Sequence, residues 1–385
     1  MSQTSEGRQE SPDERPEARI ADRLRTRIGE SGPVPVPVFM AEALFDPIAG
    51  FYATKDPLGA GADFVTAPEI SQMFGEVIGL WAAQAWVDMG SPAHVHLVEL
   101  GPGKGTLMHD ILRTGRVVPG FLNALEVTLV EASPALKMVQ GRVLADSPVQ
   151  IRWADRLEKA PDGPAVILAN EFLDCLPVRQ AVKAGGVWRE RCVGLHPDDE
   201  ARFAFVTGPA LSSADLEFVP ESLRDLPEGS LVELRPGDRQ IVDALALRFS
   251  RHKGRALFID YGPAKSEPGD TLQAIRAHEK VDPLDRPGTA DLTTRVDFET
   301  LAKAGIEAGL DVHGPQTQRD FLAALGIAQR TKMLAARVPE KRDMLLRQLD
   351  RLTGEDQMGV LFKAICLSSP GLPDPAGLPP FTAQG

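Results

Sequence analysis

The sequence lacks long apolar runs, has few cysteines and carries no excess of positive charge. No apolar stretch approaches the about 20 residues that a membrane-spanning helix needs. The three cysteines, Cys175, Cys192 and Cys366, lie far apart, and no C-x-x-C pair occurs, which argues against a disulfide framework and a zinc site. The net charge of −12 argues against a nucleic-acid-binding surface, which is usually basic. We therefore expect no membrane insertion, no bound metal and no nucleic-acid partner.

The N-terminal residues 1–16 are polar, contain prolines and are predicted to form a disordered tail. They have no apolar core, as a secretory signal would, and they carry several acids, which a mitochondrial presequence avoids. The few, scattered cysteines fit a reducing compartment. From these features we expect a cytoplasmic bacterial protein.

Strand patterns and helix patterns alternate through most of the chain. Continuous apolar runs such as PAVILAN (164–170) are typical of strands buried on both faces. This alternation predicts an α/β protein with a mostly parallel sheet, in which ligands bind outside the carboxyl ends of the strands. The predicted strands of this sheet cover 94–100, 124–132, 149–153, 164–170, 255–262 and 310–313, with a last strand within 359–367.

Other regions do not follow the alternation. The run PVPVPV (33–38) is predicted to be an extended connector, since proline interrupts helices. Residues 180–235 resemble hairpin strands and are interpreted as a β-rich insertion, and residues 263–296 as a long irregular stretch. The expected organisation is a helical and loop segment over 17–90 that covers the active site, a core over 91–368 and a flexible tail over 369–385.

The stretch LVELGPGKGTLMHDI (97–111) places a glycine turn between a predicted strand and a helix. It is not a P-loop, because Lys104 precedes its glycine and the second glycine is missing. It narrowly misses the dinucleotide pattern G-x-G-x-x-G, because Thr106 occupies the third position. The acid before the turn, Glu99, would repel a phosphate but would suit a cationic ligand.

Acids follow three successive predicted strands, at Glu99, Glu131 and Asp155. S-adenosylmethionine has an ammonium, a sulfonium and one carboxylate, and it has no phosphate. Glu131 could accept hydrogen bonds from ribose hydroxyls, and Asp155 could accept one from an adenine amino group. Alternatively, each acid is only a solvated residue at the end of a strand, but their joint placement beside a glycine turn favours the cofactor.

Several long motifs resemble the MidA-like family of S-adenosylmethionine-dependent methyltransferases. They include VELGPGKGTLMHDILR, LVEASPAL, ANEFLDCLPVRQ, FIDYG and MGVLFKAICL, and the resemblance runs from about residue 37 to 367. It implies a Rossmann-like, seven-stranded class I methyltransferase sheet whose last strand is antiparallel. It also implies that Glu99, Gly101, Pro102, Gly103 and Gly105 form the cofactor turn. Glu131 would then hold the ribose, and Asp155 would lie near the adenine.

The family includes a mitochondrial assembly factor that dimethylates an arginine of a core subunit of respiratory complex I. A guanidinium stays charged and delocalised, so carboxylates are needed to hold and polarise it. Glu171 is the predicted guanidinium ligand, with Asp174 as a second acid. Asn170 could hold backbone or cofactor groups. Alternatively, Glu171 is an acid at a helix N-terminus, stabilised by the helix dipole.

Two loops and a strand end supply further candidates for substrate binding. The loop over 59–72 is rich in Gly, Asp, Ser and Thr, and the stretch over 263–296 is long enough to be functional. Each residue could instead serve as a cap, a turn or a packing residue, and the surroundings of His278 lack metal-ligand spacing. The candidates are Asp63, Glu69, Ser71, Gln72, Asp260, Tyr261, His278 and Asp291.

Together these features predict a protein arginine methyltransferase that uses S-adenosylmethionine. By resemblance, its partner would be a core subunit of complex I, methylated during assembly. A small-molecule methyltransferase and a non-catalytic assembly factor remain alternatives, and a dinucleotide oxidoreductase is disfavoured by Glu99 and Thr106. The oligomeric state stays open, with a homodimer as one option.

Overall fold

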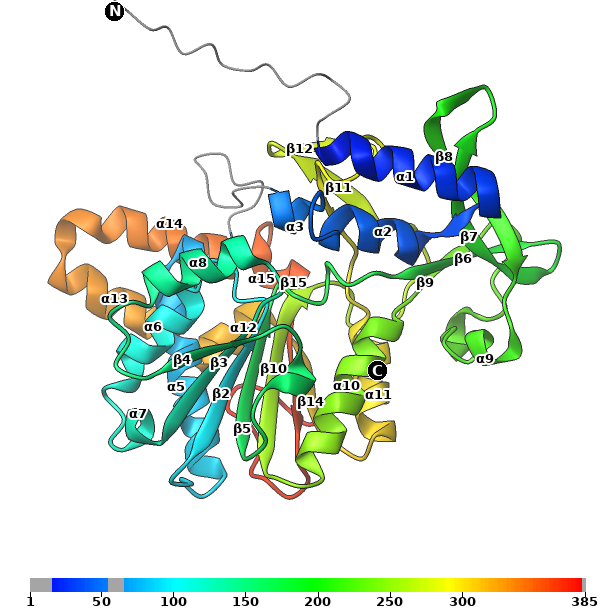
Figure 1. The fold of residues 1–385 in the computed structure, drawn as a ribbon. Helices are drawn as coiled ribbons and strands as arrows, with labels where there is room; N and C mark the ends of the chain where they lie inside the picture. Colours follow the sequence, from blue (N-terminus) through cyan, green and yellow to red (C-terminus); the bar gives the residue numbers. More distant parts are fainter. Residues whose placement is uncertain (1–15, 55–65, 383–385) are drawn as a thin grey trace, which may run out of the picture.

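The computed structural model describes residues 16–54 and 66–382 (Figure 1). The expected disordered tail therefore lies outside the described residues, except for Pro16, at which the first helix begins. A central sheet with helices on both faces carries a second, smaller sheet and two N-terminal helices at its upper end (Figure 1). In the described part of the chain, no helix is both long and apolar enough to cross a bilayer.

The central sheet has seven strands in the order β14-β15-β10-β5-β2-β3-β4. The strands from β10 to β4 are parallel, whereas β15 is antiparallel to both β10 and β14. This is the fold that the resemblance implied, including the antiparallel last strand. The strands are β2 (Val95–Leu100), β3 (Leu125–Val130), β4 (Ile151–Ala154), β5 (Ala165–Asn170), β10 (Gly254–Tyr261), β14 (Asp311–Thr317) and β15 (Phe362–Ser368).

Apolar side chains alternate along these strands and form one core on each face of the sheet. On one face Leu97 and Val166 share a core with α5 and α6, and on the other Val98 and Ile167 share one with α10 and α11. The helices are α5 (Gln72–Asp88), α6 (Thr106–Gly115), α7 (Phe121–Ala124), α8 (Pro134–Val143), α10 (Pro236–Phe249), α11 (Phe298–Glu307) and α12 (Gln318–Ala324). Ser133 caps α8 by accepting a hydrogen bond from the N–H of Leu136.

The insertion and a short N-terminal strand form a second sheet, in which β1 (Val34–Pro35), β7 (Val187–His196), β6 (Arg179–Ala184) and β9 (Leu231–Leu234) lie side by side. A long strand, β8 (Asp199–Ala210), pairs with β7. Helices α1 (Pro16–Ser31) and α2 (Val36–Phe45) share a core with this sheet. The prediction of an extended connector over 33–38 holds for β1 but is wrong from Val36 onward, where α2 begins, because proline is tolerated in the first turn of a helix.

Two further predictions about irregular segments need correction. Residues 263–296 contain a small sheet of three strands, which are too short and polar to give a clear pattern: β11 (Gln273–Arg276), β12 (Glu279–Val281) and β13 (Asp291–Thr293). The C-terminal segment, described as far as residue 382, packs against the body and is not a free tail. Leu378 is buried, and the indole N–H of Trp81 donates to the carbonyl of Ala376 over 3.2 Å.

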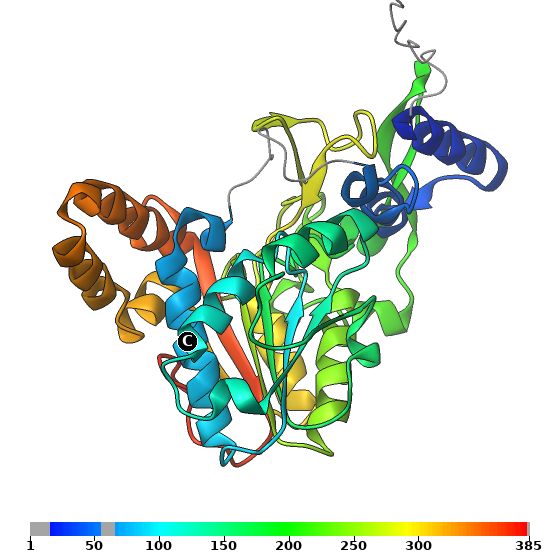
Figure 2. The same cartoon turned by 60° about the vertical axis from the view of Figure 1, so that its left-hand side comes forward.

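A helical hairpin stands out beside the central sheet (Figure 1, Figure 2). It consists of α13 (Ile327–Arg337) and α14 (Arg342–Thr353), and a one-turn helix, α15 (Met358–Leu361), leads from it into β15. Two other short helices, α3 (Phe51–Thr54) and α4 (Ala67–Ile70), flank the undescribed residues 55–65.

Candidate active site

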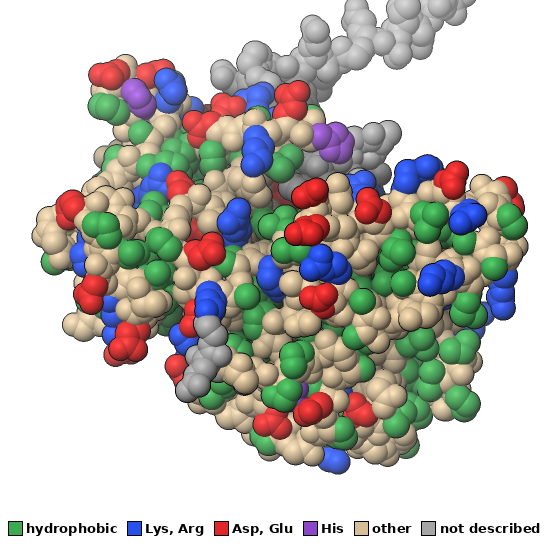
Figure 3. Space-filling view, turned by 180° about the vertical axis from the view of Figure 1, so that it is seen from behind, with side chains coloured by type: hydrophobic (Ala, Val, Ile, Leu, Met, Phe, Trp, Pro, Cys, Tyr) green, Lys and Arg blue, Asp and Glu red, His purple; other side chains and the backbone are tan. Residues whose placement is uncertain are grey.

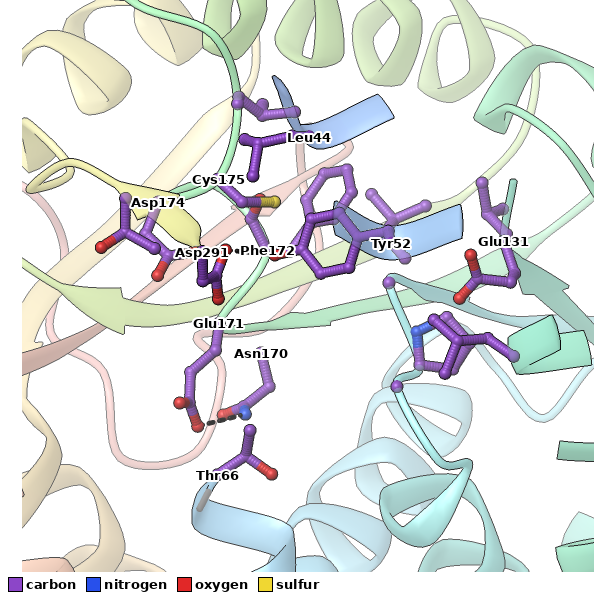
Figure 4. Close-up of a pocket in the computed structure, with 18 of the residues that line it drawn as sticks. Leu44, Tyr52, Thr66, Glu131, Asn170, Glu171, Phe172, Asp174, Cys175 and Asp291 are labelled. Atoms are coloured by element: carbon purple, nitrogen blue, oxygen red, sulfur yellow. Dashed lines mark hydrogen bonds between the residues drawn. The ribbon is translucent and has the colours of Figure 1, made fainter. Parts of the chain in front are cut away.

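A cavity of about 1080 Å³ lies at the carboxyl ends of the parallel strands. Residues at the ends of β2, β3, β4, β5 and β10 line it, together with Tyr52 of α3 and Asp291 of β13. Figure 4 shows two ends of this cavity, with Glu131 at one and Glu171, Asp174, Cys175 and Asp291 gathered at the other. The cavity therefore joins the predicted cofactor region to the predicted substrate region.

Three glycines with positive φ shape the turn after β2. At Gly101 (φ +62°) a Cβ atom would lie 2.8 Å from the Phe172 ring. At Gly103 (φ +52°) it would meet no atom within 4 Å, and this residue lines the cavity. Gly105 (φ +84°) is the N-cap of α6. Gly103 thus leaves space for a ligand to approach the backbone.

Glu99 is a buried carboxylate, 3% exposed, at the end of β2. Among the described residues, its Oε2 atom has no hydrogen-bond partner, and the same holds for Oδ1 of Asn170. Burial raises the pKa of Glu99 to about 8. Both residues line the cavity, so a ligand with a cationic or hydrogen-bond-donating group would satisfy two acceptors that are otherwise orphaned.

Glu131 is held in place by residues around it. Its Oε1 atom accepts from the backbone N–H of Ser133 over 2.8 Å, and its Oε2 atom accepts from Nε2 of Gln140 over 3.1 Å. The Gln140 amide also donates to the carbonyl of Gly103 over 2.8 Å, and its Oε1 accepts from the Trp153 indole. Gln140 was missed because its position within α8 carries no local motif.

Asp155 lines the cavity as expected, but its side chain is exposed and its carboxylate pairs with Lys159 over 2.8 Å. The hydrogen bond from Lys159 lowers the pKa of Asp155. The residue is therefore placed near the predicted adenine region, with its charge already partnered.

Glu171 has left-handed backbone geometry (φ +53°), which is strained for a non-glycine residue and often marks a functional site. Its Oε1 atom accepts from Nδ2 of Asn170 over 3.0 Å and from the backbone N–H of Ala67 over 2.9 Å. Burial, and then the charge of Asp260, raise the pKa of Glu171 to about 7. No helix follows Glu171 among the described elements before β6, so the alternative role at a helix N-terminus does not hold.

Asp174 and Asp291 make this end of the cavity acidic. Asp174 is buried, and its pKa is raised well above the ordinary value by burial and by the neighbouring charges of Asp260 and Asp291. The Tyr52 hydroxyl donates to Oδ1 of Asp291 over 3.0 Å (Figure 4). Buried carboxylates that repel one another favour a cationic ligand between them.

Two other predicted substrate residues also line the cavity. Glu69 forms an ion pair with Lys104 of the glycine turn over 3.0 Å. The Tyr261 hydroxyl accepts a hydrogen bond from Nε2 of Gln273 over 3.2 Å, and burial raises the pKa of Tyr261. Gln273 is thus brought to the cavity together with Tyr261.

The structure does not bring the remaining candidates into the cavity. Ser71 caps α5 by accepting from the N–H of Met73 over 3.2 Å, and Gln72, the first residue of α5, lines a different groove. His278 is exposed in the turn between β11 and β12. Asp63 lies outside the described residues. Asp260 is buried, and its carboxylate accepts four backbone N–H groups, from residues 172, 173, 174 and 261.

Arg235 is a second buried residue that holds this loop. Its guanidinium donates to the carbonyl of Leu173, to the carbonyl of Arg295 and to the hydroxyl of Thr294, and it pairs with Asp238. Asp260 thus binds N–H groups of the loop after β5, whereas Arg235 binds one of its carbonyls. No local pattern indicates this role of Arg235, because Arg235 lies 62 residues from Leu173 in the chain.

Comparison with known proteins agrees with this geometry. A family model for S-adenosyl-L-methionine-dependent methyltransferases matches residues 77–316. The protein arginine methyltransferase NDUFAF7, mitochondrial, of Danio rerio is 36% identical, with 89% of this chain and 85% of that protein covered. The human protein of the same name is 35% identical, with 92% and 85% covered. This chain therefore belongs to the family of S-adenosyl-L-methionine-dependent methyltransferases that the family model describes.

A solved structure supports both the fold and the cofactor. The crystal structure of a protein from Burkholderia thailandensis, bound to S-adenosyl-homocysteine, matches with a TM-score of 0.80, 27% identity and 94% of each chain covered. The family uses S-adenosylmethionine, so this chain is an S-adenosylmethionine-dependent methyltransferase. The orphaned acceptors of Glu99 and Asn170 and the open space at Gly103 fit that cofactor.

The expected location needs correction. The N-terminal residues led us to expect a cytoplasmic bacterial protein. The curated relatives from Danio rerio, Drosophila melanogaster and Homo sapiens are instead named as mitochondrial proteins, which contradicts that expectation.

In the described part of the chain, no group of three His, Cys, Asp or Glu side chains is arranged to hold a metal ion.

Proposed function

We propose that this enzyme is a protein arginine N-methyltransferase. The observation that carries this proposal is the set of carboxylates at one end of the cavity: Glu171, Asp174 and Asp291. A guanidinium is always charged and presents its donors in a planar fork that matches carboxylates. The curated relatives of this chain are named protein arginine methyltransferases, which supports the same substrate.

The other end of the cavity would hold the cofactor, which supplies the methyl group on its sulfonium. The free Oε2 atom of Glu99 suits the ammonium of its methionine part. Glu131, fixed by Gln140 and the Ser133 N–H, suits the two ribose hydroxyls, and Asp155 lies where the adenine is expected. Asn170 lies between the two ends, with Nδ2 bound to Glu171 and Oδ1 facing no partner among the described residues.

The protein residues would align the substrate and take up a proton. Methyl transfer is an in-line displacement, so the main task is to hold the nucleophilic nitrogen in position and exclude water. The nitrogen must also lose a proton to remain a guanidinium of unchanged charge. Glu171 can accept it, because its pKa of about 7 lets the carboxylate exchange protons near neutral pH.

By resemblance, the target is a core subunit of respiratory complex I. Supporting this, the relatives that share most of the chain carry the name NDUFAF7. In a deletion strain, arginine methylation of that subunit should disappear. If its methylation were unchanged, this target would be wrong, although the arginine chemistry could still hold for another protein.

The direct test is transfer of labelled methyl from S-adenosylmethionine into a lysate of the deletion strain, with amino-acid analysis of the labelled bands. We expect one band that carries methylarginine and is lost with Glu171→Gln. The exposed Glu221 provides a matched control, so Glu221→Gln should keep full labelling. Label in small molecules alone would point instead to a small-molecule methyltransferase.

A third variant tests whether turnover is needed at all. Gly103→Val should block the approach of the cofactor, since Gly103 lines the cavity and has positive φ. An enzyme would lose its function in the cell with this change. A strain that assembles complex I normally with Gly103→Val, despite abolished methyl transfer, would favour a non-catalytic assembly factor.

A further inference from the structure

A groove of about 280 Å³ lies beside the active-site cavity. One wall comes from residues 69–72, at the end of α4 and the start of α5. The other wall comes from the α13–α14 hairpin: Leu334, Val338, Lys341, Met344, Leu345 and Gln348. Glu69 lines both the groove and the cavity, so the two hollows adjoin.

A single face of α14 connects the groove to the active-site cavity. Lys341 precedes the helix, and Met344, Gln348 and Arg351 follow at spacings of three and four residues, which places these four side chains on one face. The first three line the groove, whereas Arg351 lines the cavity. We call these four residues the α14 strip. Ten residues of helix at about 1.5 Å each make it about 15 Å long.

The hairpin is basic although the whole chain has a net charge of −12. Residues 327–353 contain seven Lys and Arg against three Asp and Glu. The exposed cations form no ion pair with any described residue: Lys332, Arg337, Lys341, Arg342, Arg347 and Arg351. Viewed from behind, Lys and Arg side chains gather over this part of the molecule (Figure 3). Unpaired cations of this kind attract an acidic partner.

We propose that the α14 strip binds an acidic, extended segment of the substrate protein, on the same polypeptide as the methylated arginine. This inference rests on the proposed arginine methylation. The acids of the cavity select the arginine, and the cations of the strip select acids beside it. An extended chain rises about 3.3 Å per residue, so the length of the strip corresponds to four or five residues. An acid of the substrate that pairs with Lys341, at the far end of the strip, therefore lies at least about four positions from the target arginine.

The shape of the site favours a polypeptide over an anionic membrane. A bilayer surface is flat, whereas Leu334, Val338 and Leu345 line a hollow that continues toward the cavity. The half-buried Leu334 and the exposed Met344, which both line the groove, would also offer an apolar contact to the chain. Such a chain can enter the groove and place its arginine in the cavity at the same time.

The test compares two synthetic peptides of about 15 residues, which is long enough to span both hollows. Each has one central arginine, flanked either by glutamates or by lysines at the predicted positions. The measured quantity is the ratio of their kcat/KM values for labelled methyl transfer. We expect the wild-type enzyme to prefer the glutamate peptide by about tenfold at low salt, and to lose this preference as salt screens the charges.

Lys341→Glu should reduce this ratio about fivefold or more, through KM. Lys332→Glu is the matched control, because Lys332 is an exposed lysine of the same hairpin that does not line the groove. It should leave most of the preference intact. Equal losses in both variants would overturn the proposed strip in favour of diffuse attraction.

The remaining outcomes separate this inference from the proposed function. Methylation of both peptides without a charge preference would overturn the strip and leave the arginine activity standing. Methylarginine in a lysate protein but in neither peptide would also overturn it, since an extended segment would then not be recognised. Flotation of the enzyme with phosphatidylserine vesicles, abolished by Lys341→Glu in the absence of any peptide preference, would show a membrane as the occupant. Loss of all arginine methylation, with S-adenosyl-homocysteine still bound, would overturn both proposals.

Discussion

The backbone N–H of Asp174 donates a hydrogen bond to Oδ2 of the buried Asp260 carboxylate over 3.2 Å. The same oxygen accepts from the N–H groups of Phe172 and Leu173, and Oδ1 accepts from the N–H of Tyr261. Asp260 therefore acts on the backbone and does not line the cavity. It holds the loop that carries Glu171 and Asp174 in place, so the buried carboxylate of Asp260 positions these two side chains without contacting the ligand.

Asp260→Asn tests this positioning role. The new amide keeps the shape, but its NH₂ group would face backbone N–H donors that need an acceptor. We expect the free energy of unfolding to fall by about 1–3 kcal/mol, since buried donors lose their partners. Denaturant unfolding measures this loss, and kcat should fall at least about tenfold because the loop is displaced.

The control is Asp243→Asn, at an exposed aspartate of α10 that pairs with Arg239. It should change the unfolding free energy by less than about 0.5 kcal/mol. A full-activity Asp260→Asn enzyme with wild-type stability would show that the four hydrogen bonds contribute little.

Asp174→Asn should make the protein more stable and less active. Asp174 is buried beside Asp260 and Asp291, and its raised pKa means that ionising it costs stability. The pKa of Asp174 is higher in the folded protein than in the unfolded chain. Protonation of Asp174 therefore stabilises the fold at low pH, and this stabilisation is lost as pH rises from about 4 through the raised pKa. Removing the charge should therefore raise the stability at neutral pH by about 0.5–2 kcal/mol.

The measurement is thermal unfolding across pH, combined with kinetics. Wild-type protein should lose more stability than Asp174→Asn as the pH rises, while the variant should show a higher KM for the arginine substrate. If Asp174→Asn were less stable than the wild type at neutral pH, the repulsion argument would fail.

Much of the fold and of the cofactor region could be predicted from the sequence, because the residues that form them follow local sequence patterns. The buried strands show as apolar runs, and Glu99, the glycines and Glu131 stand directly at strand ends. The supporting residues could not be found in this way, since each acts over a long separation. Gln140 binds Gly103 at 37 residues' distance, and Asp260 binds Phe172 at 88. Asp260 was mistaken for a substrate ligand because a strand-end acid looks the same whether it faces a cavity or a loop.

Gln140→Leu tests one of these distant contacts. The change removes hydrogen bonds to the carbonyl of Gly103 and to the carboxylate of Glu131. Leucine is apolar but similar in size to glutamine, so the volume of the side chain is nearly unchanged. Hydrogen bonds to charged groups contribute about 1.5–3 kcal/mol, so we expect about tenfold or greater weakening of cofactor affinity. Calorimetric titration with S-adenosyl-homocysteine measures it.

Gln329, an exposed glutamine on α13, offers a control for that experiment. Gln329→Leu should bind the cofactor as the wild type does. Unchanged affinity in Gln140→Leu would mean that Glu131 keeps its position without the amide.

Cofactor affinity should rise with pH because of Glu99. Burial holds the pKa of this carboxyl at about 8 in the absence of a ligand, so at pH 7 most molecules carry a proton there. The ammonium of the cofactor favours the ionised form, so its binding below that pKa must release a proton. Affinity for S-adenosyl-homocysteine should then rise up to about tenfold per pH unit between about pH 6 and 8, and level off above.

Calorimetry in buffers of different ionisation enthalpy counts the released proton directly. Glu99→Gln should bind more weakly and lose this part of the pH dependence, because no proton remains to be displaced. Any dependence that survives in the variant would belong to other groups, such as Glu131, whose pKa burial also raises. A wild-type affinity that stays flat across this range would show that the ammonium is held elsewhere, and Glu99 would then be a buried acid without a role in binding the cofactor.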